Sequence, residues 1–135
     1  MPHQPMQVEL AGGLELFNRA HFFDAHELLE DVWRSLARDQ PRRKHLQGLV
    51  QLAVAFHHES TGNPLGARSL LERALQNLEG ADSSFPELDL DRLRLELEAW
   101  RSYLAGVSHR PRLPQISKHR PGPQEREILE KNTPC

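Results

Sequence analysis

Residues 22–33, in which apolar and ionisable side chains alternate, contain the groups best suited to chemistry in this sequence. At about 100° per helical residue, the apolar positions fall within one arc, and His26 and Glu30 lie one turn apart at its edge. Glu27 lies further round, toward the side that should meet water. We therefore expect one imidazole and one carboxylate to be half-buried beside the core.

Two more histidines, His57 and His58, lie near the end of the next long apolar stretch. On a helix, His57 projects on an apolar side, whereas His58 shares a different face with Gln47 and Gln51. If this helix packs against the helix that contains His26 and Glu30, His57 is the better candidate of the two histidines to contact them. We expect both glutamines to form hydrogen bonds, because a buried amide without a partner is costly.

Together, His26, Glu27, Glu30 and His57 form a polar cluster with two alternative roles. In the structural interpretation, which we favour, a carboxylate near the core pairs with an imidazole and fixes helix register, with no cofactor and no catalytic residue. In the alternative, His26, Glu30 and His57 bind one divalent transition metal such as zinc, and Glu27 is the general base of a hydrolase-like enzyme. Acid–base catalysis by Glu27 and His57 without a metal is also open.

Two well-defined metal motifs are absent from this region. A zincin requires His-Glu-x-x-His, and Glu30 occupies the place of the second histidine. A di-iron bundle requires two Glu-x-x-His motifs, and the sequence contains none. The spacing therefore indicates neither enzyme class.

The elements that must position the cluster are helices, because apolar residues recur at three- and four-residue steps and no strand pattern is convincing. Pro41 can begin a helix, and Gly62-Asn63-Pro64 can end one helix and begin the next. The helix between them is apolar almost all round, which is typical of a central helix, and Gly48 within it indicates a closely packed neighbour. We predict an all-α bundle of about five antiparallel helices, near residues 8–19, 22–38, 41–61, 64–79 and 89–105.

The last part of the chain has a different composition. Residues 107–123 contain four prolines, four Lys or Arg residues and no acid, a composition that does not build a core. We therefore expect a single helical domain at residues 1–106 and a basic, Pro-rich tail at 107–135 that is irregular or lies over the surface. Within the tail, Glu125–Lys131 can add a turn or two of helix.

Composition limits the partners and the compartment. The net charge is −2, which gives no general attraction to nucleic acid or to an anionic membrane, and we expect neither as a partner. No apolar run approaches the roughly 18 residues of a membrane span, and the N-terminus does not resemble a secretory signal. The one cysteine, Cys135, allows no internal disulfide. These features predict a soluble cytoplasmic protein, and a homo-oligomer is compatible with them.

Three other features have structural interpretations. The basic residues Arg42–His45 are expected to form a solvated helix start. Trp33 and Trp100 lie on apolar stripes and are expected in the core or at an interface. An oligomeric adaptor that presents Trp100 or the tail to a partner is therefore a further functional alternative.

Residues 14–80 resemble the DUF309 family of small, uncharacterised helical proteins. The residues that carry the resemblance are Phe17-Asn18, Phe22, Phe23, Ala25-His26-Glu27-x-Leu29-Glu30-x-x-Trp33, Leu46-Gln47-Gly48, an alanine-rich stretch into His57, Gly62-Asn63, Leu70 and Leu71. The resemblance implies an all-α fold and no established activity. We expect a non-catalytic scaffold or small binding protein built around a largely structural His–Glu cluster.

Overall fold

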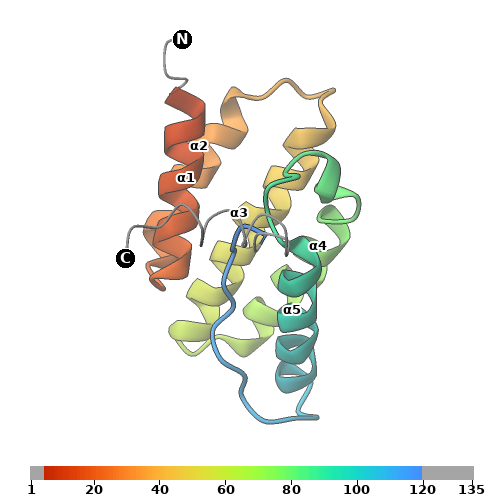
Figure 1. Ribbon diagram of the computed structural model, residues 1–135. Helices are drawn as coiled ribbons and strands as arrows, with labels where there is room; N and C mark the ends of the chain where they lie inside the picture. The colour runs from red at the N-terminus through yellow and green to blue at the C-terminus, as the bar shows by residue number, and fades with distance from the viewer. Residues whose placement is uncertain (1–4, 120–135) are drawn as a thin grey trace, which may run out of the picture.

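Five α-helices make up most of the computed structural model, which describes residues 5–119 (Figure 1). Apart from one isolated β-bridge between Leu88 and Lys118, the described residues contain no strand. The predicted all-α bundle is confirmed. None of the described helices has the length and apolar character needed to cross a membrane. The elements are α1 (Pro5–Asn18), α2 (Phe22–Ser35), α3 (Pro41–Ser60), α4 (Pro64–Asn77), the short 3-10 helix η1 (Ala81–Ser83) and α5 (Leu90–Leu104).

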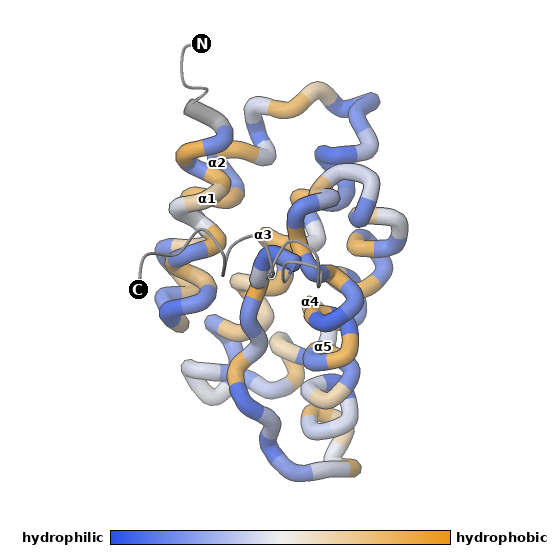
Figure 2. The backbone as a smooth tube through the Cα atoms, in the orientation of Figure 1, coloured by the Kyte–Doolittle hydropathy of each residue, from blue (hydrophilic) through white to orange (hydrophobic). Residues whose placement is uncertain are grey.

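Helix α3 is the central element of the bundle, as predicted from its apolar residues on almost every face. It packs against α2 on one side and α4 on the other, while α1 packs on α2 and α5 packs on α4. Phe56 of α3 meets Phe17 of α1 and Trp100 of α5 edge to face, at ring-centroid distances of 6.0 and 5.0 Å. Figure 2 shows hydrophobic positions recurring along the helices between hydrophilic ones. The buried residues of α2, α4 and α5 are all apolar, so each of these three helices turns an apolar stripe inward.

Gly48 allows α3 and α4 to approach closely. A Cβ atom at this position would lie 2.9 Å from the Cγ atom of Leu78 and 3.2 Å from the carbonyl oxygen of Ala74. The predicted close neighbour is therefore the end of α4. This contact offsets the cost of about 1 kcal/mol that glycine carries inside a helix relative to alanine.

The turn between α3 and α4 forms as its sequence predicts. Gly62 has a φ of +81°, a left-handed conformation that glycine adopts without steric cost. The side chain of Asn63 accepts a hydrogen bond from the Gly66 amide at 3.0 Å, and Pro64 is the first residue of α4. This short connection makes the two helices antiparallel neighbours.

Residues 107–119, which we call the strap, return from the end of α5 across the bundle between α1 and α5 (Figure 1). The Trp100 indole donates a hydrogen bond to the Arg112 carbonyl at 2.8 Å. The Asn18 side chain donates to the Ile116 carbonyl at 2.9 Å and accepts from the Ile116 amide at 2.7 Å. The strap therefore joins the ends of α1 and α5, which are distant in sequence.

The strap is also part of the core, which its composition did not predict. Ile116 is 4% exposed and packs with the central apolar cluster, and Pro114 is buried. An extended segment can be buried here because side chains of α1 and α5 satisfy its backbone polar groups. The core thus extends beyond residue 106. The helical turn expected at Glu125–Lys131 and the cysteine Cys135 lie outside the described residues.

Candidate functional site

The His26–Glu30 contact lies on α2, half-buried. The Nε2 atom of His26 is 2.9 Å from Oε2 of Glu30, and the two side chains are 27% and 28% exposed. The other carboxylate oxygen of Glu30 accepts a hydrogen bond from Arg34 at 3.0 Å. The three residues follow one another at four-residue steps, so a single helical face places them in line.

A small hollow between α2 and α3 adjoins this contact. Phe23, His26, Val54 and His57 line it, its volume is about 110 Å³ and its surface is almost entirely apolar. The ring of Phe23 lies 5.9 Å from the imidazole of His26 and 5.5 Å from that of His57, between centroids. Phe23 is nevertheless 52% exposed. We call this site the Phe23 hollow.

The members of the polar cluster separate into different environments. His26 and Glu30 are in contact, and His57 faces the same hollow as His26, where the Phe23 ring approaches both imidazoles. Within residues 5–119, His57 makes no ion pair with Glu30 or with another carboxylate. Glu27 is exposed and is not among the residues that line the hollow.

The same part of the chain contains no group of three or more His, Cys, Asp or Glu side chains placed to hold a metal. The three residues named as metal ligands, His26, Glu30 and His57, are thus not gathered around one point. The metal centre and the role of Glu27 as a base stay predictions.

The supporting residues lie outside the hollow. The side-chain oxygen Oε1 of Gln51 accepts a hydrogen bond from the side-chain amide of Asn77 at 2.8 Å and so links α3 to α4. The Nδ1 atom of His58 lies 3.3 Å from the Asn63 amide nitrogen, beside the turn that follows α3. Gln47 is half-buried. These contacts belong to helix packing.

The basic start of α3 is more packed than the expected solvated helix start. The guanidinium groups of Arg42 and Arg43 lie over the rings of Phe85 and Trp33, at 5.3 and 4.0 Å from the ring centroids. His45 is buried, and its Nδ1 atom lies 2.6 Å from a serine hydroxyl in the loop before α5. A guanidinium is weakly hydrated and stacks on aromatic faces, which explains the difference.

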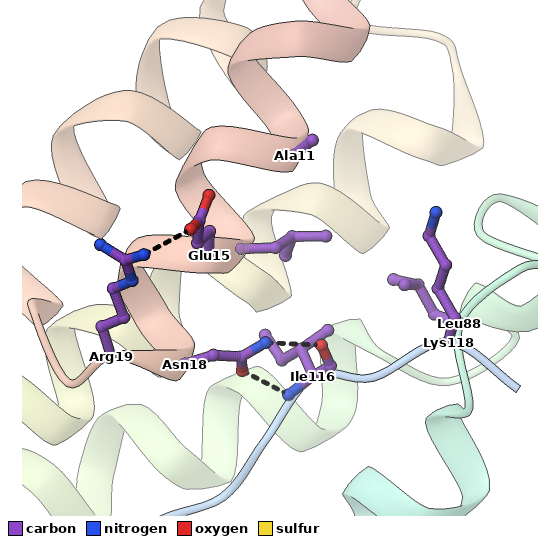
Figure 3. A pocket seen from close by; sticks show the side chains of 8 residues that line it. Ala11, Glu15, Asn18, Arg19, Leu88, Ile116 and Lys118 are labelled. Carbon is purple, nitrogen blue, oxygen red and sulfur yellow. Dashed lines mark hydrogen bonds and ion pairs between the residues drawn. The ribbon is translucent and has the colours of Figure 1, made fainter. Parts of the chain in front are cut away.

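A second concave surface, which we call the α1–strap groove, was not found from the sequence. It has a volume of about 380 Å³ and lies between α1 and residues 88 and 116–118 (Figure 3). Leu14, Leu88 and Ile116 contribute apolar surface to it, and Asn18 holds Ile116 through the two hydrogen bonds drawn there. Its two sides lie about a hundred positions apart in the chain, so no local pattern indicates it.

Known proteins are similar to part of the chain. Residues 10–70 match the family model described as "Domain of unknown function (DUF309)". An uncharacterized protein of Aquifex aeolicus (strain VF5) is 32% identical over 82 residues, which are 61% of this chain and 24% of that protein. The uncharacterized protein YpuF of Bacillus subtilis (strain 168) is 34% identical over 76 residues, which are 55% of this chain and 42% of YpuF.

The match spans less than half the length of both curated relatives, and neither name states an activity. The matched segment includes all of α2 and α3, so it contains the Phe23 hollow, whereas α5 and the strap lie outside it. The resemblance inferred from the His26–Trp33 region is confirmed: residues 10–70 of this chain match the DUF309 family model.

Proposed function

We propose that this protein is a non-catalytic binding protein whose Phe23 hollow receives one apolar side chain from a basic segment of a partner protein. The observation that carries the proposal is the ring of Phe23, which is 52% exposed although two imidazoles and an apolar hollow adjoin it. An aromatic side chain at the edge of an apolar hollow is typical of a binding surface.

The His26–Glu30 contact supports a structural role for the polar cluster. Glu30 holds His26 on one oxygen and Arg34 on the other, which orients the imidazole as one wall of the hollow. Both carboxylate oxygens of Glu30 then have partners within α2. A base poised for catalysis would instead direct a carboxylate oxygen at the hollow, whose surface is almost entirely apolar.

The size of the hollow favours an aliphatic side chain. An engineered cavity of about 150 Å³ holds benzene, so a hollow of about 110 Å³ fits a smaller group such as the side chain of leucine or valine. Burying such a side chain contributes about 1.5–3 kcal/mol. This is enough for a contact that depends on the residue type, and other contacts must supply the rest of the affinity.

Charge favours a basic partner segment. Asp24 and Glu27 are exposed on α2 close to Phe23 in the sequence, and neither forms an ion pair within residues 5–119. Lysine or arginine beside the inserted side chain would meet these two carboxylates. Complementary charge of this kind raises the association rate and selects against acidic partners.

A short peptide tests the proposal. We expect acetyl-Gly-Lys-Leu-Lys-Gly-amide to shift the NMR resonances of His26, Val54 and His57 with a dissociation constant in roughly the millimolar range. Peptides with Glu-Leu-Glu or Lys-Gly-Lys at the centre should bind more weakly, since one lacks the charge and the other the apolar group. Phe23→Ala should abolish binding.

The matched control is Leu95→Ala, which removes another exposed apolar side chain, 74% exposed, from α5. It should leave peptide binding unchanged. The proposal is wrong if the Lys-Leu-Lys peptide shifts no resonance of the hollow, or if the acidic peptide binds equally well. Stoichiometric binding of zinc chloride to untagged protein, with shifts at His26 and His57, would replace it with the metal alternative.

A further inference from the structure

The α1–strap groove is an accessible surface with an apolar centre and charged ends. The buried residues Leu88 and Ile116, each 4% exposed, form its floor, and the half-buried Leu14 and the exposed Ala11 lie beside them. Lys118 lies at one end of the view in Figure 3, opposite the ion pair of Glu15 and Arg19, in which the charged atoms are 2.9 Å apart. An adjoining hollow of about 220 Å³ near Lys118 extends the groove toward Arg42.

The described chain ends beside this groove. The amide of His119, the last described residue, donates a hydrogen bond to the Glu87 carbonyl at 3.1 Å, and its neighbour Lys118 lines the groove. Residues 120–135 follow, and Pro121-Gly122-Pro123 come almost at once. A Pro-Gly pair marks a turn, so the sequence favours a reversal of direction at this point. A chain that reverses there passes back toward the groove that Lys118 lines.

The returning residues have the composition that the groove requires. Ile128 and Leu129 are the only large aliphatic residues in 120–135, and glutamates flank them. From His119 to Ile128 a chain can reach about 30 Å at most. The groove follows α1 from Ala11 to Asn18, a rise of about 10 Å, so the pair can reach every part of it.

We propose that residues 124–131 dock in the α1–strap groove of the same molecule, with Ile128 and Leu129 on its apolar centre. The glutamates that precede them, Glu125 and Glu127 on either side of Arg126, then lie toward the end of the groove where the two cations Lys118 and Arg42 outnumber the one acid, Glu87. The docked segment covers α1 and leaves the Phe23 hollow, on α2 and α3, accessible. The α1 face is therefore a site for this chain's own segment.

The single cysteine provides the test. A nitroxide attached to Cys135 lies a few residues beyond the docked pair, and its unpaired electron broadens the NMR signals of nearby amides. In dilute full-length protein we expect selective loss of the signals of α1 residues 11–18. The amides of Val54 and His57 should keep their intensity. Reduction of the nitroxide should restore the α1 signals.

Variants identify the contact. Ile128→Asp with Leu129→Asp should restore the α1 signals, whereas Thr133→Asp, which adds charge outside the docked pair, should leave the loss in place. Ala11→Glu, at an exposed position of the groove, should also restore them without changing the melting temperature. The proposal is overturned if labelled full-length protein shows no selective loss on α1. A loss that grows with protein concentration overturns it too, in favour of a second copy as the occupant.

Discussion

Replacing Ile116 by alanine tests whether the strap is part of the folded core. Ile116 is 4% exposed and lies among apolar residues of the central cluster, while its backbone is held by Asn18. If the strap merely covered the surface, as its proline and arginine content suggests, shortening this side chain would change little. If the strap completes the core, the free energy of unfolding must fall substantially.

The magnitude follows from the atoms removed. Isoleucine to alanine deletes three carbon atoms, and each buried methylene contributes about 0.8 kcal/mol, which gives about 2.4 kcal/mol for transfer alone. A remaining cavity adds to this cost, and observed values for such changes are about 2–5 kcal/mol. Because Ile116 also lines the open α1–strap groove, the site can partly relax and fill with water. We therefore expect a loss of about 2–3 kcal/mol.

Urea unfolding followed by tryptophan fluorescence measures the effect. With a slope of about 2 kcal/mol per molar urea, the midpoint should fall by about 1 M or slightly more. Val107→Ala is the matched control, because Val107 lies on the same strap and is 79% exposed; its effect should stay within about 0.5 kcal/mol. An Ile116→Ala midpoint equal to that of the control would refute the argument that the strap belongs to the core.

Three further predictions concern α3, α2 and the loop before α5. Gly48→Ala should destabilise the protein by about 1–3 kcal/mol in thermal melts, because the new Cβ would lie 2.9 Å from a leucine side chain at the end of α4; a neutral result would show that the two helices can separate. A double-mutant cycle of His26→Ala and Glu30→Ala should give a coupling of about 0.2–1 kcal/mol, since both side chains are over a quarter exposed; coupling above about 2 kcal/mol would contradict this. The hydrogen bond that Arg94 donates lowers the pKa of Asp82. This stabilisation is fully present above the ordinary pKa near 3.8 and is lost as the pH falls through the lowered value. Asp82→Asn should therefore cost about 0.2–1 kcal/mol at pH 7 and nothing in strong acid, and an equal cost at both pH values would exclude this explanation.

The helix boundaries show how far local patterns extend. Pro41 begins α3, and Gly62, Asn63 and Pro64 form the turn into α4, because each residue acts through its own backbone or the next turn. All five predicted helices continue past the observed ends, by one to three residues; α2, for example, ends at Ser35 and the chain is extended at Leu36. A proline gives a stronger local signal for the start of a helix than any residue here gives for its end. The helix ends were therefore predicted less accurately than the starts at Pro41 and Pro64.

The candidate site also contains contacts that the sequence could predict and contacts that it could not. The His26–Glu30 contact could be predicted because residues four positions apart share a helical face. The position of His57 beside Phe23 could not, since it requires the relative rotation of α2 and α3. The stacking of Arg43 on Trp33 could not be predicted either, because it depends on how the end of α2 packs against the start of α3. Contacts between elements depend on packing, which no single helix specifies.

By itself, the sequence determined five helical segments, the sharp α3–α4 turn, the His26–Glu30 contact and the resemblance of residues 10–70 to DUF309, because periodicity, caps and four-residue spacing are local properties. The tertiary structure decided that Phe23 borders a hollow and that Ile116 enters the core. Both outcomes depend on which surfaces meet when helices pack. The strap illustrates the reason: its composition indicates solvent, but Asn18 and Trp100 satisfy its backbone and allow Ile116 to be buried.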